Sequence, residues 1–310
     1  MEKLRLGSRG SKLALWQAEY VKQVLTLAVP DLRVEIQVIK TTGDKILDVA
    51  LSKIGDKGLF TKEIEKKLLD GTIDIAVHSM KDLPSQIEAG LGIGAVLPRE
   101  NPQDVLISKF NQKLKDLPIG AVIGTSSLRR KAQIKHYRPD IKIVELRGNV
   151  ETRIRKMQEE EMDGIVLAYA GVKRLGYESL ISECLSYDLL MPAVGQGAIA
   201  VENRVGDLDV LEIVKKINHE PTRVQVEAER SFLARLEGGC QVPVAAIADL
   251  KGQELRIQGL VASLDGQKLI SMEMIGKPSQ AAELGRNLGQ SLLDAGAGFI
   301  LDEIKHTGAS

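Results

Sequence analysis

The sequence predicts an α/β protein with two similar lobes that face a common cleft, followed by a smaller C-terminal α+β domain. Three observations predict it: a length of 310 residues, a strand, turn and helix order that occurs twice, and antiparallel strand patterns near the C-terminus. This length exceeds one typical domain of about 100 to 150 residues. We expect lobe one over residues 1–98 with 198–217, lobe two over 103–192 and the C-terminal domain over 220–310.

The first lobe begins with a short apolar run at residues 4–6, which enters a glycine and serine turn at 7–11. Apolar residues at helical spacing follow the turn, so the order is strand, turn, helix. Segment 34–40 then predicts a strand that ends in a polar glycine turn. Residues 59–69 predict an amphipathic helix, and a further strand opens at Asp74.

The second lobe repeats this order. A strand at 121–123 enters a turn rich in Ser and Thr at 124–130, and a strand at 141–146 enters a second polar turn. A helix at 150–160 and a strand after Asp163 follow. Such repetition indicates parallel sheets with helices on both faces, which bind ligands at the carboxyl ends of their strands.

Two connections are expected between the lobes, a turn-rich hinge at residues 99–104 and a return strand within 192–202. Neither has the length or composition of a free linker, which argues against two independent domains on a flexible string. Farther on, alternating apolar runs on either side of Asp265 and Gly266 predict a hairpin. Helices are expected before and after it, at residues 210–217 and 280–293.

Composition narrows the function. The 42 basic and 42 acidic residues give a formal net charge of zero, without the basic excess of a nucleic-acid binder. Two cysteines and four scattered histidines make neither a disulfide framework nor a zinc-ligand spacing, so we expect no metal. The N-terminal segment lacks the apolar stretch of a signal peptide or membrane span, which predicts a soluble, cytoplasmic protein.

Both strand-to-helix turns carry groups that suit anions, because exposed N–H groups and the helix dipole favour negative charge there. For a single such turn, helix capping by Ser and Thr with solvated arginines is the favoured explanation, but two matched turns that face one cleft favour an anion site. Further arginines are expected near other strand ends of lobe two, and arginine forks suit carboxylates. The residues concerned are Arg9, Ser11, Thr125, Ser126, Ser127, Arg129, Arg130, Arg147, Arg153 and Arg174. The pattern favours a small polyanionic ligand.

A carboxylate, Asp82, follows Ser79 and Lys81 at the end of the strand that opens at Asp74. Lys81 and Asp82 alone read as a solvated ion pair. Among arginines, however, a lone carboxylate serves as proton donor, proton acceptor or counter-charge for a cationic intermediate. We interpret His78 as a hydrogen-bonded histidine at the strand end rather than as a catalyst.

Two loops leave alternatives open. Cys240 follows two glycines and precedes a proline, which leaves its sulfur accessible for attachment or nucleophilic chemistry as well as for an inert role. Cys184 is expected to be buried and inert. Lys53, Lys57 and Phe60 lie in a glycine-punctuated basic loop, which is either a mobile surface loop or a lid over the cleft.

Together these segments closely resemble the porphobilinogen deaminase (hydroxymethylbilane synthase) family along essentially the whole chain. The matching segments, in family order, are GSRGSKLALWQ, KGLFTKE, DIAVHSMKDLP, IGTSSLRR, LRGNVETR, LAYAGVKRLG, PAVGQGAIAVE and LEGGCQVP. The resemblance implies two lobes like those of a type II periplasmic binding protein, plus a C-terminal domain. It also implies a transferase of porphyrin and haem biosynthesis that joins four porphobilinogen molecules head to tail, loses ammonia at each step and releases hydroxymethylbilane.

The resemblance further implies a dipyrromethane cofactor, held covalently through a thioether to Cys240, and a monomer. Asp82 is the implied catalytic residue, which stabilises the azafulvene-like cation and moves protons. The implied cofactor-binding residues are Ser79, Lys81, Thr125, Ser127, Arg129, Arg130 and Arg147. The implied substrate-binding residues are Arg9, Ser11, Gln17, Lys53, Lys57, Phe60, Arg153, Arg174 and Gln196.

Two other classes share a bilobal shape. A solute-binding protein usually carries a signal peptide, and the Cys240 loop would have no function in it. A ligand-sensing regulatory domain is expected to carry a DNA-binding helix-turn-helix, whereas this chain opens on its first strand. We therefore expect the enzyme.

Overall fold

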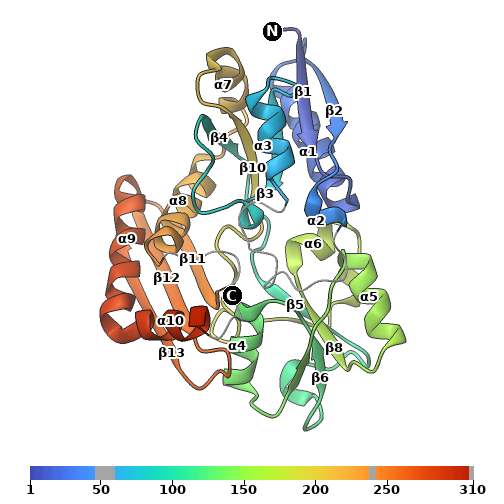
Figure 1. Ribbon diagram of the computed structural model, residues 1–310, viewed down its shortest axis with the longest axis vertical. Coiled ribbons are helices and arrows are strands. Elements are labelled where there is room, and N and C mark those ends of the chain that lie inside the picture. Colours follow the sequence, from blue (N-terminus) through green and yellow to red (C-terminus); the bar gives the residue numbers. More distant parts are fainter. Residues whose placement is uncertain (46–59, 237–241, 307–310) are drawn as a thin grey trace.

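The computed structural model describes residues 1–45, 60–236 and 242–306, and it contains three sheets (Figure 1). The first sheet has the order β2-β1-β3-β10-β4. Its strands are β1 (Lys3–Ser8), β2 (Arg33–Val38), β3 (Ile75–Ser79), β4 (Leu91–Val96) and β10 (Ile199–Arg204). β1 runs parallel to β2 and β3, whereas β10 runs antiparallel to both β3 and β4.

The second sheet has the corresponding order, β7-β6-β8-β5-β9. Its strands are β5 (Asp104–Ser108), β6 (Val122–Gly124), β7 (Lys142–Val144), β8 (Gly164–Ala168) and β9 (Glu183–Cys184). The antiparallel strand of each sheet is the first strand after the chain crosses from the other sheet: β5 follows β4, and β10 follows β9. The repeat expected from the sequence thus appears as two sheets of one topology.

Helices follow the strands as the sequence predicts. The helices of these two lobes are α1 (Lys12–Ala28), α2 (Thr42–Lys45), α3 (Lys62–Leu69), α4 (Leu128–Tyr137), α5 (Val150–Glu159), α6 (Tyr169–Arg174) and α7 (Leu208–Lys215). Ser11 and Ser127 cap α1 and α4, because each side chain accepts a hydrogen bond from a backbone N–H of the first turn. Leu4 and Leu6 of β1 are fully buried against α1, which anchors the turn between these elements.

The third sheet is antiparallel and consists of β11 (Val244–Lys251), β12 (Glu254–Ala262) and β13 (Leu269–Gly276). Helices α8 (Glu220–Arg235), α9 (Ala281–Leu292) and α10 (Gly298–His306) pack with it. Phe232 of α8 is fully buried, and a Cβ at Gly259 would lie 2.5 Å from its ring. The expected hairpin turn joins β12 and β13, with Gly266 at φ +76°.

Figure 1 shows the three units around a common centre, with the short 3₁₀ segment Met80–Asp82 near it. The predicted α/β fold with two similar lobes and a small C-terminal α+β domain is confirmed. We refer below to the unit of the first sheet as lobe one and to that of the second as lobe two. The prediction for Cys184 is wrong: this residue lies on the short edge strand β9 and is exposed.

Candidate functional site

One pocket of lobe one collects six of the residues predicted for the site. It lies at the carboxyl ends of β1 and β3, beside the start of α1. Its lining includes Arg9, Ser11, Gln17, Phe60, Ser79 and Asp82, together with Leu13, Ala14, Thr61, Val77 and His78. These residues come from segments far apart in the sequence, and the parallel arrangement of β1 and β3 brings them together.

Internal contacts hold the walls of this lobe-one pocket in place. The amide of Gln17, which is buried in α1, donates a hydrogen bond to Ser79 Oγ at 2.9 Å. The Arg9 guanidinium lies over the ring of Phe60, 4.1 Å from its centroid, a distance at which a cation and an aromatic face attract each other. Ser11 Oγ accepts from Ala14 N at 3.3 Å and so acts as the helix cap.

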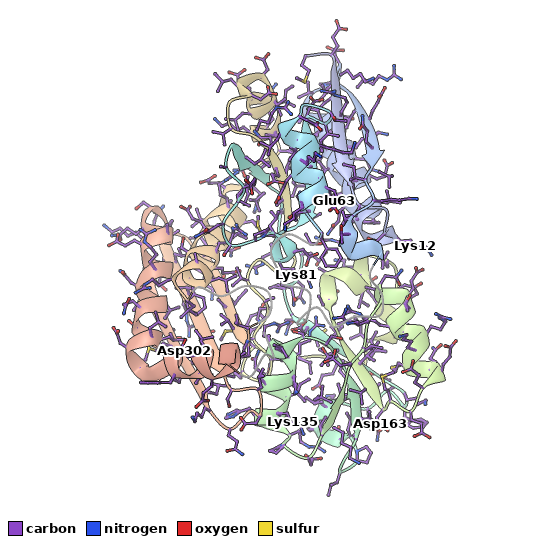
Figure 2. The ribbon with its side chains drawn as sticks, in the orientation of Figure 1. Lys12, Glu63, Lys81, Lys135, Asp163 and Asp302 are labelled. Carbon is purple, nitrogen blue, oxygen red and sulfur yellow. The ribbon has the colours of Figure 1, made fainter. Side chains whose placement is uncertain are left out.

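Lys81 and Asp82 lie on the Met80–Asp82 segment, with Lys81 near the centre of the molecule (Figure 2). Asp82 is exposed and borders the lobe-one pocket. Lys81 Nζ donates a hydrogen bond to Gln196 Oε1 at 3.3 Å. Burial lowers the pKa of Lys81 to about 8, the charge of Asp82 opposes that shift and the charge of Arg130 adds to it.

Arg129 and Arg130 at the start of α4 are buried around one carboxylate, Asp104. Asp104 Oδ1 accepts from Arg130 Nη2 at 2.7 Å, and Asp104 Oδ2 lies 2.7 Å from Arg129 Nη1. Burial favours the neutral carboxyl, but the two guanidinium groups hold the pKa of Asp104 well below its usual range. Further bonds fix the arginines, to Met191 O at 2.6 Å and to Val166 O at 2.8 Å.

Arg153 connects the two lobes electrostatically. Its Nε donates to Gly148 O at 2.8 Å within lobe two. Burial lowers the pKa of Arg153 to about 10, Arg130 adds to that shift, and Asp82 of lobe one opposes it. The charge of Arg147 also lowers the pKa of Arg153. We call Lys81, Arg129, Arg130, Arg147 and Arg153 the cationic cluster.

The remaining predicted residues contact backbone or the connections between lobes. Thr125 Oγ1 accepts from Ser127 N at 3.2 Å, which stabilises the turn before α4. Arg174 Nη2 donates to Gly197 O at 2.7 Å and its guanidinium lies 5.5 Å from the ring of Trp16, so it bridges α6 to lobe one. Gln196 Nε2 donates to Pro102 O at 2.6 Å. Lys53, Lys57 and Cys240 lie outside the residues that the structure describes.

Four buried acids escaped the sequence analysis: Asp104, Glu229, Glu202 and Glu65 of α3. Asp104 was assigned to a hinge, yet it opens β5 and forms ion pairs with two arginines. Glu229 of α8 binds Arg99 at 2.5 Å, and Glu202 of β10 binds His78 at 3.1 Å. A charged residue within an apolar strand or helix, as in IAVENR, was the available signal for Glu202.

The comparisons with known proteins agree along nearly the whole chain. The family model "Porphobilinogen deaminase, dipyromethane cofactor binding domain" matches residues 4–212, and "Porphobilinogen deaminase, C-terminal domain" matches residues 224–294. The chain belongs to the porphobilinogen deaminase family. It is 61% identical to the porphobilinogen deaminase of Syntrophomonas wolfei, with 98% of this chain and 100% of the relative covered. It is 53% identical to that of Moorella thermoacetica, with 98% and 97% covered.

The chain is also distantly similar to a solved structure, the periplasmic VFT2 domain of Bordetella pertussis BvgS. The identity is 15% and the TM-score 0.42, with 70% of this chain and 86% of that chain covered. Among the described residues of the present chain, no helix combines the length and apolar character needed to cross a membrane.

The cationic cluster fits the dipyrromethane cofactor of the porphobilinogen deaminase family, which carries carboxylate side chains. Five cations of the cluster face two carboxylates, Asp82 and Asp104, so the junction between the lobes has an excess of positive charge. Burial weakens the hydration of these cations, and an anionic group would compensate for that loss. Asp82 connects the lobe-one pocket to this junction, because it lines the pocket and interacts electrostatically with Arg153 of lobe two.

Proposed function

We propose that the lobe-one pocket and the cationic cluster form the active site of a porphobilinogen deaminase, the transferase also called hydroxymethylbilane synthase. It joins four porphobilinogen molecules head to tail, with loss of ammonia at each step, and releases hydroxymethylbilane for porphyrin and haem biosynthesis. Membership of the family and the dipyrromethane-binding domain support this assignment over almost the full length of the chain.

The observation that carries the proposal is the position of Asp82. Its carboxylate is exposed at the border of the lobe-one pocket and acts on Lys81 and on Arg153 of the opposite lobe. A substrate in the pocket therefore meets one carboxylate within a field of cations. When ammonia leaves porphobilinogen, positive charge develops on its pyrrole ring, and a fixed carboxylate stabilises that charge. Asp82 also accepts and returns protons during each step.

The cations bind the acetate and propionate groups of substrate and product. Arg9, Ser11, Gln17 and Phe60 of the pocket, with Arg153, Arg174 and Gln196, are proposed to hold the substrate, as are Lys53 and Lys57. Ser79, Thr125 and Ser127 are proposed to hold the cofactor together with Lys81, Arg129, Arg130 and Arg147. Charge-assisted bonds from arginine to carboxylate supply both orientation and affinity.

Dipyrromethane, when attached to Cys240, supplies the primer that keeps the growing chain on the protein. We propose three domains, which cover residues 1–98 with 198–217, residues 103–192 and residues 220–310. The strands of each of the three sheets support this division. We also propose a cytoplasmic monomer that binds no nucleic acid, in line with its balanced charge. Light scattering of the purified protein tests the monomer.

The test is Asp82→Asn, which removes the charge and keeps the size. Turnover should fall by about 10²-fold or more, in line with loss of general acid–base and electrostatic assistance. The midpoint of thermal unfolding and the covalent mass should stay those of the wild type. The matched control is Asp31→Asn on an exposed turn of lobe one. Near-wild-type turnover of Asp82→Asn removes Asp82 from the mechanism.

A further inference from the structure

A buried group of ionisable residues lies behind the lobe-one pocket, and the mechanism above does not use it. It consists of Glu65, His78 and Glu202, which are 6%, 6% and 0% exposed. His78 Nε2 lies 3.1 Å from Glu202 Oε2. We call these three residues the buried triad.

The strand register explains how the buried triad forms. β3 and β10 pair antiparallel, with His78 opposite Ala200 and Ala76 opposite Glu202. His78 and Glu202 are therefore diagonal neighbours on one face of the sheet. Helix α3 packs against β3 and β10. Its Glu65 interacts electrostatically with His78 of β3 and with Glu202 of β10.

Burial and mutual repulsion act on the two carboxylates of the buried triad. Glu65 Oε1 and Glu202 Oε1 are buried and have no hydrogen-bond partner among the described residues. Two ionised carboxylates side by side in the interior are costly without compensating charge. Burial raises the pKa of Glu65, Thr61 opposes that shift and the charge of Glu202 adds to it. The 3.1 Å contact between His78 Nε2 and Glu202 Oε2 gives the second carboxylate a partner that can share a proton with it.

The buried triad opens toward the substrate through His78. His78 is one of the residues that line the lobe-one pocket, together with Asp82 and with Thr61, the partner of Glu65. The charged groups that interact with the imidazole are Glu202 from β10 and Glu65 from α3. Asp82 from the Met80–Asp82 segment and Arg9 from the turn after β1 line the same pocket.

We propose that His78, held by Glu202 and Glu65, delivers a proton to the leaving amine of porphobilinogen. This inference rests on the proposed function. As the carbon–nitrogen bond breaks, its electron pair stays on nitrogen, the amine takes the proton from the imidazolium, and ammonia departs. The pyrrole ring keeps the positive charge beside Asp82, and His78 regains a proton from Glu65 or from solvent.

The first test observes the proton itself. Histidine ¹⁵N resonances of the full-length holoenzyme are recorded from pH 5 to 9. The His78 signal is assigned by elimination, from the signals lost in the single variants His136→Gln, His219→Gln and His306→Gln. We expect an imidazolium at pH 7 in the wild type and a neutral ring at pH 7 in Glu202→Gln. A wild-type His78 that is neutral from pH 5 upward overturns the proposal, and this measurement needs no substituted His78 to fold.

The second test is kinetic. His78→Gln and Glu202→Gln should each lower kcat by about 10-fold to 10²-fold, with KM changed by less than about threefold, since the proton acts on departure rather than binding. Their double variant should be no slower than His78→Gln. His136→Gln, whose imidazole contacts Gly266 O instead, should keep wild-type kcat.

Each outcome of the kinetic test separates the inference from the proposed function. A kcat of His78→Gln within threefold of the wild type, at equal covalent mass, overturns the role of His78 while the deaminase activity stands. A wild type that releases no ammonia from porphobilinogen despite a full covalent mass excess overturns the proposed function itself. If His78→Gln unfolds at the assay temperature, Glu202→Gln and the ¹⁵N titration decide.

Discussion

Asp104 binds Arg130 with a single oxygen: Oδ1 accepts from Nε at 3.2 Å and from Nη2 at 2.7 Å. Its other oxygen faces Arg129, so one carboxylate organises both arginines of α4. The arginines are therefore held by the protein before any ligand arrives. That arrangement reduces the ordering cost of binding a carboxylate ligand.

Asp104→Asn should loosen both arginines. Removing one partner from a buried ionic group typically costs about 3 to 5 kcal/mol, because charge is left uncompensated. We expect a lower urea midpoint and a smaller fraction of chains that carry the cofactor, read by intact mass. Asp116→Asn, an exposed change in the same lobe, is the control. Unchanged stability and full loading in Asp104→Asn would show that the arginines need no counter-charge.

Arg153→Ala should weaken substrate binding. Loss of a charge-assisted hydrogen bond is worth about 1.5 to 3 kcal/mol, so KM for porphobilinogen should rise by roughly 10-fold to 100-fold. Arg155→Ala is a matched control on the same helix, because Arg155 is exposed and pairs only loosely with Glu159, at 3.9 Å. Equal KM values for the two variants would contradict a substrate contact at Arg153.

Lys81 makes a pH-dependent contribution to stability. Its pKa is about 8 in the folded chain against 10.5 for a free side chain, so between these values the unfolded chain holds more protons. The free energy of unfolding should therefore rise from pH 8 to 10.5 through this group. Urea unfolding of Cys240→Ser, which cannot hold the cofactor by a thioether, should show this rise. The rise should be smaller in the double variant that carries both Cys240→Ser and Lys81→Met. Identical pH slopes of the free energy of unfolding in the single and double variants would refute a contribution from Lys81.

Glu229 links the connections between the lobes to the C-terminal domain. Its carboxylate accepts from Arg99 Nη1 at 2.5 Å, from Gly195 N at 2.7 Å and from Ala248 N at 2.8 Å. Glu229→Gln should lower the free energy of unfolding by about 3 kcal/mol or more, because Arg99 then stays buried without an opposite charge. Glu227→Gln, exposed on the same helix, should be neutral in urea unfolding. An unchanged urea midpoint in Glu229→Gln would deny the linking role.

The sequence predicted those parts of the fold that depend on local patterns. Alternating apolar runs and the Asp265–Gly266 turn identified the hairpin, and Ser11 and Ser127 marked helix starts. Helix α8 was left unassigned, because much of the segment from His219 to Arg235 is polar. Its caps, His219 accepting from Thr222 N and Pro221 in the first turn, were the signals available.

The pairings within the site could not be predicted in the same way. Asp104 meets Arg130 only because β5 enters the second sheet beside β8, and Glu202 meets His78 only because β10 returns to β3. Such contacts depend on register between distant strands, which one sequence does not specify. For Asp82 and Cys240 the residues alone offered alternatives, and the family resemblance selected the catalytic role and the attachment role among them.

The most direct test of the account is the intact mass of the purified, denatured protein beside that of Cys240→Ser. We predict a covalent excess equal to a dipyrromethane in the wild type and the bare polypeptide mass in the variant. A wild type that has the bare mass, and gains neither adduct nor activity after incubation with preformed hydroxymethylbilane, would contradict the account.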